Sequence, residues 1–375
     1  MALAPTSEQQ QLRDSVRRLL ERKSTSEDVR ALIDGGSQGD ERLWRQMSSE
    51  LGLQGIAIPE HLGGTGAGVA ELSIVLEEMG RTLLVGPYFS SIALAGQALV
   101  ASSDADAQQR WLPRIADGSM TATLAVAEES DRWDGRDCAT TVSRDGAEMT
   151  LTGIKMFVPD GCTSDVTLVI TQDASEPTMF AVERSATVPV VELVESLDLT
   201  RPMARLTLDH TPATAIDLGG DPAARVQRIF DLAVIAVAAE QLGGAAKCLE
   251  MAVEYARTRE QFGRPIGSFQ AIKHKCADLL MEIEAARSAL LFAARSADSD
   301  SEETSIAAST AKVWCSRAFT RAAKENIQIH GGIGYTWEHD AHLYLRRAKT
   351  SEMLFGSPAF HRRRVAQLAG IEPRP

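Results

Sequence analysis

Apolar residues recur at intervals of three and four residues in the first part of the chain. This pattern predicts helices over 7–23 and 41–53, and a longer helix-rich stretch over 68–99 that glycine and proline interrupt. Thr6 and Ser7 precede the first helix and suit an N-cap, because a hydroxyl there can accept from a free backbone N–H. The segment 56–68 contains Pro59 and several glycines, so we expect an irregular loop there.

From about Thr121 the pattern changes to short runs rich in β-branched residues. Strands are predicted within 122–130, 148–159, 165–171, 178–183 and 205–220, with turns such as 144–146 between them. A block of roughly one hundred residues of this kind between two helical blocks indicates a small barrel or sandwich.

The helical period returns after Pro222. Long amphipathic helices are predicted over 224–262, 266–297, 304–332 and 342–370, and a polar acidic loop covers 298–305. Long helices with short joints favour an antiparallel four-helix bundle. We therefore predict an α+β multidomain chain with an N-terminal helical domain (1–120), a central β domain (121–220) and a C-terminal bundle (221–375).

Charge and composition exclude some classes of function. The net charge of −12 disfavours nucleic-acid binding, although a few local cations would suffice for a small anionic ligand. We find no signal peptide, no metal-binding spacing and no apolar stretch long enough to span a bilayer. The five cysteines are scattered, which is typical of buried, reduced thiols in a cytoplasmic protein.

Two C-terminal strings carry a specific signal: YARTREQFGRPIGSFQAIKHKCADL at 255–279 and IQIHGGIGYTWEHDAHLYLRRAK at 327–349. Both closely resemble signature helices of the acyl-CoA dehydrogenase family, and weaker resemblance at 52–64, 109–130 and 151–165 follows the family's order. The resemblance implies an FAD-dependent oxidoreductase that removes an α-proton and a β-hydride from an acyl-CoA thioester in lipid or sterol catabolism. It also implies an electron-transfer flavoprotein as acceptor and a tetramer, homomeric or heteromeric, built as a dimer of dimers.

The resemblance further implies that FAD lies between the β domain of one subunit and the bundle of its neighbour. Arg259 would reach the pyrophosphate across the interface, where a guanidinium fork suits two phosphates. Purely structural roles stay open as alternatives: a surface charge for Arg259, a helix-surface amide for Gln270, and a helix C-cap for Gly331 and Gly332. The other residues that the resemblance places at the cofactor are Phe262, Gln270, Gln328, Gly331, Gly332, Gly356, Ser357, Phe157 and Pro159.

The family's general base is missing from its usual places. A glutamate commonly precedes the glycine of the last motif, and here that position is Phe355. Some members carry the base on the first bundle helix, and the matching residue is Ala233. Glu240 lies about two turns further along that helix in an apolar run. It is either a relocated base or a structural carboxylate.

The flavin-facing part of the β block also departs from the family. The family commonly has Thr-Glu-Pro and Gly-Ser-Asp where this chain reads AEESDRWD at 127–134, and Trp-Ile-Thr where it reads FVP at 157–159. Hydroxyls expected near the flavin are therefore missing at Ala127 and Pro159. Phe157 either covers the flavin ring or packs in the β core.

Three hypotheses follow. The chain is a flavoprotein dehydrogenase subunit that is active with a catalytic partner, a non-catalytic subunit that completes a partner's FAD site in an α2β2 assembly, or a family member with altered flavin chemistry. The second rests on one contrast. Residues that would reach a neighbour's FAD are retained, whereas those of the chain's own active site are altered.

Overall fold

The computed structural model describes residues 5–130, 132–135, 138–146, 148–173, 176–184 and 189–371. The first helix, α1, is capped by Thr6, whose hydroxyl accepts from the Gln9 backbone N–H, as the sequence predicted. The N-terminal helices are α1 (Ser7–Lys23), α2 (Ser26–Asp34), α3 (Glu41–Leu51), α4 (Val69–Arg81), the π-helix η3 (Phe89–Gly96), α5 (Gln97–Ala101) and α6 (Ala105–Ala116).

The central region consists of two four-stranded sheets that enclose an apolar layer. One sheet has the order β1 (Ala122–Ala125), β4 (Val166–Asp173), β5 (Glu176–Glu183), β8 (Thr214–Ile216), with β1 parallel to β4. The other has the order β2 (Thr141–Asp145), β3 (Glu148–Pro159), β7 (Met203–Pro212), β6 (Val190–Val194), and it is antiparallel throughout. A register shift in β3 between Lys155 and Val158 brackets Phe157.

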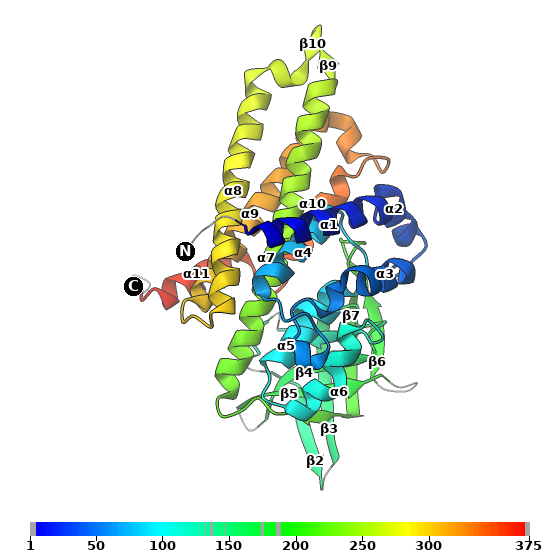
Figure 1. Ribbon diagram of the computed structural model, residues 1–375, viewed down its shortest axis with the longest axis vertical. Helices are drawn as coiled ribbons and strands as arrows, with labels where there is room; N and C mark the ends of the chain where they lie inside the picture. The colour runs from blue at the N-terminus through cyan, green and yellow to red at the C-terminus, as the bar shows by residue number, and fades with distance from the viewer. Residues whose placement is uncertain are drawn as a thin grey trace.

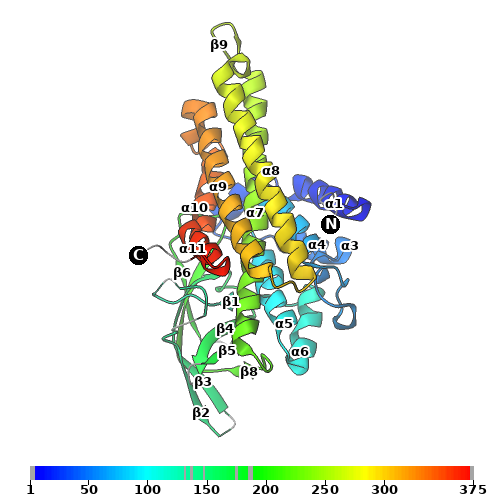
Figure 2. The same cartoon turned by 90° about the vertical axis from the view of Figure 1, so that its left-hand side faces the viewer.

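The C-terminal region is a bundle of long helices: α7 (Pro222–Thr258), α8 (Gln270–Asp298), α9 (Thr304–His330), α10 (Ala341–Met353) and α11 (Pro358–Leu368). The α+β fold class, with helices at both ends and sheets between, is confirmed. The division into domains at residues 120 and 220 stays a prediction. In Figures 1 and 2, α7 and α8 rise together from the body of the molecule.

Two sequence expectations about these helices were wrong. The single helix predicted over 342–370 is broken between α10 and α11, because Phe355 and Gly356 have positive φ angles of 56° and 101°. Ser357 then caps α11, and Pro358 starts it. Helix α7 is also long and apolar enough to cross a membrane, but 94% of its apolar stretch is buried in the protein. It therefore lies in the core of the protein.

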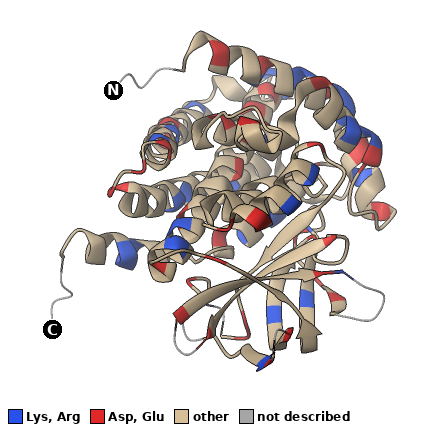
Figure 3. Cartoon of the chain, turned by 60° about the horizontal axis from the view of Figure 1, so that its bottom comes forward, with Lys and Arg blue, Asp and Glu red and all other residues tan. Residues whose placement is uncertain are grey.

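Helices α4 and α7 cross at very short range because glycines face the contact. A Cβ added at Gly80 would lie 2.1 Å from the Glu240 carbonyl oxygen, and one at Gly243 would lie 1.8 Å from that of Glu77. No side chain fits at either position. The crossing fixes the N-terminal helices against the bundle, while charges of both signs are interspersed over the helices (Figure 3).

Candidate cofactor and substrate site

The connection between α7 and α8 is a small hairpin at the far end of both helices (Figure 1). Its strands β9 (Glu260–Gln261) and β10 (Arg264–Pro265) are joined by Phe262 and Gly263, whose φ angles of 54° and 73° fit a two-residue turn with positive φ at both positions. Phe262 is 91% exposed. Arg259 and Gln270 flank the hairpin and are exposed as well. The structure therefore presents these three predicted cofactor residues outward.

Gln328, Gly331 and Gly332 lie together at the end of α9 and the start of the helical turn η5 (Gly331–Tyr335). All three are exposed. A Cβ added at Gly331 or Gly332 would have no atom within 4 Å in the described part of the chain. Gly331 has a positive φ of 67°, which accounts for a glycine, whereas Gly332 has no such requirement. Close approach of a group from outside the chain would explain the second glycine.

The chain's own inner site is filled by aromatic side chains. The Trp133 ring lies 4.9 Å from that of Phe355 and 6.4 Å from that of Phe157, measured between centroids. Phe230 on α7 lies 6.5 Å from Phe355. Trp133, Phe230 and Phe355 are buried, and Phe157 is half-buried. Trp133 thus lies between Phe157, expected on the flavin side, and the residue at the usual base position.

The turn that carries Phe355 is held by buried polar groups. His361 Nε2 bonds the Phe355 carbonyl oxygen at 2.9 Å, and its Nδ1 bonds the Ser309 hydroxyl at 3.2 Å. Burial lowers the pKa of His361 to about 3, so the ring is neutral. Lys312, fully buried, donates to the Ser351 carbonyl at the end of α10, and burial lowers its pKa to about 7.

The loop that carries Trp133 is closed at its base by Glu128. This carboxylate accepts from the backbone N–H of Thr140 at 3.1 Å and pairs with the fully buried Lys155 at 2.7 Å. Burial alone would raise the pKa of Glu128, but the bonds from Lys155 and Thr140 outweigh it and lower the pKa. Asp131, in the same loop, lies outside the described residues. The Glu128 contacts hold the two ends of the loop together at its base.

Three phenylalanines, two at predicted cofactor positions and one at the usual base position, have left-handed backbones. Phe157, Phe262 and Phe355 have φ angles of 54°, 54° and 56°. Such a conformation costs a residue with a side chain about 1–2 kcal/mol, and surrounding structure must hold it. Leu83, Asp160, His210 and Asp300 share this conformation, so the strain is not confined to the positions that the family resemblance selected.

Neither usual base position provides a proton acceptor. Phe355 and Ala233 are both buried, each 1% exposed. Glu240 is buried too, but it belongs to a cluster of charges about ten residues, or roughly 15 Å, along α7 from Phe230. Its carboxylate pairs with Arg201 and lies 3.9 Å from Arg347.

The same charge cluster includes residues from all three parts of the chain. Arg347 pairs with Asp198 at 2.7 Å, and the Arg201 guanidinium lies 4.1 Å above the Phe89 ring. Asp160, directly after Pro159, accepts from the Ser90 hydroxyl at 2.6 Å. Burial raises the pKa of Asp160 to about 6, against the opposing effects of the Ser90 bond and the nearby guanidinium groups.

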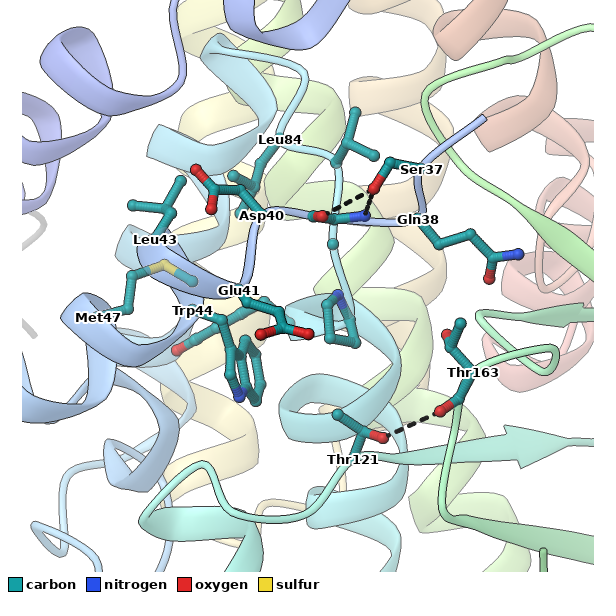
Figure 4. A pocket seen from close by; sticks show the side chains of 15 residues that line it. Ser37, Gln38, Asp40, Glu41, Leu43, Trp44, Met47, Leu84, Thr121 and Thr163 are labelled. Carbon is teal, nitrogen blue, oxygen red and sulfur yellow. Dashed lines mark hydrogen bonds between the residues drawn. The ribbon is translucent and has the colours of Figure 1, made fainter. Parts of the chain in front are cut away.

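A cavity of about 330 Å³ lies elsewhere, beside α3 (Figure 4). Leu43, Trp44 and Met47 form an apolar wall, and the hydroxyl of Thr121 donates to the Thr163 carbonyl at its edge. None of the predicted site residues lines this cavity. It is therefore separate from the candidate site.

The residues present fit a dinucleotide on one side and not on the other. The outward group, consisting of Arg259, Phe262, Gln270, Gln328 and the two glycines, leaves open space and a guanidinium without a hydrogen-bond or ion-pair partner among the described residues. The inner face does not fit a flavin ring in this arrangement, because Trp133 packs between Phe157 and Phe355. Sequence reasoning gave Trp133 no role, and its polar surroundings offered little signal.

Comparisons with known proteins identify the family. The chain matches the model of the acyl-CoA dehydrogenase N-terminal domain over residues 6–119 and that of the C-terminal domain over 223–369. It is 36% identical over 357 residues to the acyl-CoA dehydrogenase IpdE2 of Mycobacterium tuberculosis, covering 95% of each chain.

Two solved structures share the fold along nearly the whole chain. One is a variant of the Tcur3481–Tcur3483 steroid acyl-CoA dehydrogenase, with a TM-score of 0.89, 32% identity and 97% and 98% of the two chains covered. The other is the ChsE4–ChsE5 complex of Mycobacterium tuberculosis, with a TM-score of 0.90, 30% identity and full coverage of both chains. The chain belongs to the acyl-CoA dehydrogenase family of oxidoreductases.

Proposed function

We propose that this chain works in the FAD-dependent α,β-dehydrogenation of an acyl-CoA thioester, as the subunit that completes the FAD site of a catalytic partner in a mixed tetramer. The observation that carries the proposal is the contrast between the closed aromatic cluster around Trp133 and the exposed residues around Arg259. An FAD site shared between subunits needs the exposed residues around Arg259 from this chain. It does not need an open flavin pocket at the Trp133 cluster.

In this arrangement Arg259 would bind the pyrophosphate, and the Gly331–Gly332 turn would accept the adenylate against its backbone. The hydrophobic face of Phe262 would pack on the cofactor. Bound flavin supplies the acceptor for the hydride that leaves the β-carbon. The general base would come from the partner subunit, because Phe355 and Ala233 cannot accept a proton.

Substrate class and electron acceptor follow from relatives. The Tcur3481–Tcur3483 structure is described as a steroid acyl-CoA dehydrogenase, which supports a bulky, sterol-like acyl group for the assembly of this chain. We also propose cytoplasmic localisation and an electron-transfer flavoprotein as acceptor. The named ChsE4–ChsE5 complex supports assembly from two different chains.

Purification alone and after co-expression with candidate catalytic subunits tests this proposal. We expect a colourless isolated chain, and a yellow complex that reduces a dye with an acyl-CoA. Arg259→Ala should remove FAD from the complex, whereas Arg45→Ala, a surface control, should not. A yellow and active isolated chain would overturn the division of labour.

Glu240 has a separate test because it is the remaining candidate base. Its pairing with Arg201 and Arg347 supports the structural role. Glu240→Gln in the active complex should then lower stability while turnover stays within about twofold. A loss of roughly a hundredfold in turnover at full FAD occupancy would instead identify a general base.

A further inference from the structure

The short connection between α9 and α10 joins the exposed glycine turn to a tryptophan that three parts of the molecule hold. Trp337 lies five residues after Gly332 and is 45% exposed. Its ring stacks on His342 of α10, with centroids 4.7 Å apart. Two guanidinium groups lie near the same ring, that of Arg30 at 5.9 Å and that of Arg346 at 5.8 Å.

Arg30 brings the N-terminal region to this connection. It lies on α2, and Figure 1 shows α2 beside the connection that leads into α10. Its Nε and Nη2 donate to one Asp340 carboxylate oxygen at 2.9 and 2.7 Å, and its Nη1 donates to the Trp337 carbonyl at 2.5 Å. The guanidinium therefore uses its fork on a side chain and a backbone group at once, which a lysine cannot reproduce.

Other contacts hold the connection from different sides. Arg346 donates to the Leu197 carbonyl at 3.2 Å, so the Trp337 cluster also reaches the loop between β6 and β7 in the central region. On the α7 side, the Tyr255 ring stacks on His330 at 4.2 Å, and His330 lies 4.3 Å from His339. The glycine turn lies between these two sets of contacts.

The contacts of Arg30 matter for the geometry of the turn more than for global stability. A half-exposed arginine–aspartate pair alone adds little to global stability. However, a backbone turn that receives a ligand must be held within a fraction of an ångström, and exposed glycines cannot provide that rigidity. Four contacts from a residue more than 300 positions away in sequence can.

We propose that Arg30 is a positioning residue for the adenylate side of the shared FAD site: through Asp340 and Trp337, helix α2 fixes the Gly331–Tyr335 turn in its receiving geometry. This inference rests on the function proposed above. Arg30 touches no cofactor itself and acts through the turn.

The test compares Arg30→Ala and Arg30→Lys with Arg45→Ala, whose arginine makes an exposed pair with Glu41. In the isolated chain, amide hydrogen exchange over 331–340 should be roughly threefold or more faster in Arg30→Ala than in wild type, and intermediate in Arg30→Lys. Exchange over 259–263 and the melting temperature should stay near wild type in all three variants.

In the co-expressed complex, Arg30→Ala should weaken FAD binding on the order of tenfold, as the loss of an outer supporting contact does at other sites. Arg30→Lys should recover part of it. Unchanged exchange, or faster exchange with unchanged FAD affinity, would overturn the positioning role. A wild-type complex that binds no FAD while exchange over 331–340 still rises would show that the proposed function is wrong and that the contacts are structural alone.

Discussion

The two aromatic regions of the molecule differ in burial and packing, although Phe355 and Phe262 share a left-handed backbone. Around Phe355, rings pack against one another and are buried, and His361 fixes the turn beneath them. Around Phe262, the ring is 91% exposed on a hairpin at the end of two long helices. Burial makes the first region a source of stability, whereas the second adds little to the isolated chain. A residue that adds nothing to its own fold is a strong candidate for contact with another molecule.

The largest expected effect comes from removing one ring from each region. Phe355→Ala should lower the free energy of unfolding of the isolated chain by about 3–5 kcal/mol, because it leaves a cavity in a packed cluster. Phe262→Ala should change it by less than about 0.5 kcal/mol. Urea denaturation of both variants measures this difference.

In the complex the two variants should differ in the opposite order when FAD retention is measured. Phe262→Ala should lower the amount of FAD retained per unit of folded protein more than Phe355→Ala does. If Phe355→Ala costs under about 1 kcal/mol, the inner cluster is not a packed core. If Phe262→Ala destabilises the isolated chain as strongly as Phe355→Ala, the contrast between the regions fails.

Substitutions at two glycines, one in the packed helix crossing and one in the exposed turn, test the same comparison between a buried and an exposed region. Gly243→Ala should destabilise the chain by about 3 kcal/mol, since its Cβ would collide with the Glu77 carbonyl oxygen of α4. Gly332→Ala meets no atom and should leave the unfolding free energy within about 0.5 kcal/mol of wild type. Thermal unfolding separates the two, and FAD titration of the complex should then show weaker binding for Gly332→Ala. Equal stability of the two variants would contradict the close helix crossing.

A smaller expected effect is the pH dependence of stability that the buried Asp160 causes. Asp160 has a raised pKa of about 6 in the folded chain, so between about pH 4 and 6 the folded state keeps a proton that the unfolded state has lost. Stability from this group therefore falls as pH rises through that window and stays lower above it. The facing groups Arg201, Arg347, Glu240 and Ser90 remain in Asp160→Asn.

Relative to wild type, Asp160→Asn should gain roughly 2 kcal/mol of stability between pH 4.5 and pH 7. Glu41→Gln, at an exposed carboxylate, is the control and should show no such change. Parallel curves for wild type and Asp160→Asn in chemical denaturation would mean that Asp160 is ionised throughout the range.

Local sequence signals predicted the fold class because periodicity and caps act over a few residues. Thr6 before α1 is one example. The break before α11 was also within reach, since Gly356, Ser357 and Pro358 form a stop followed by a helix start. A continuous apolar period masked it.

The candidate site was harder to predict from the sequence because its contacts join residues that are far apart in the chain. Glu240 stood out as a carboxylate in an apolar run, but its partners Arg201 and Arg347 lie far away in sequence, with no local pattern to reveal them. Trp133 lies in a polar run that suggests a surface loop, yet it is buried. The cofactor roles of Arg259, Phe262 and Gly332 are tested by the experiments above, and those of Gln270 and Gln328 stay predictions.

The packing of Trp133 on Phe355 has a consequence for the history of this chain. Phe355→Glu alone would place a carboxylate against an indole ring in a dry, crowded space, where an unpaired charge is strongly unfavourable. Recovering an independent active site would require that ring to leave as well. Such a change needs at least two substitutions, of which the first is harmful, so a glutamate at position 355 is difficult to introduce step by step. Under the proposed division of labour, a dependence on a partner subunit would therefore be difficult to reverse.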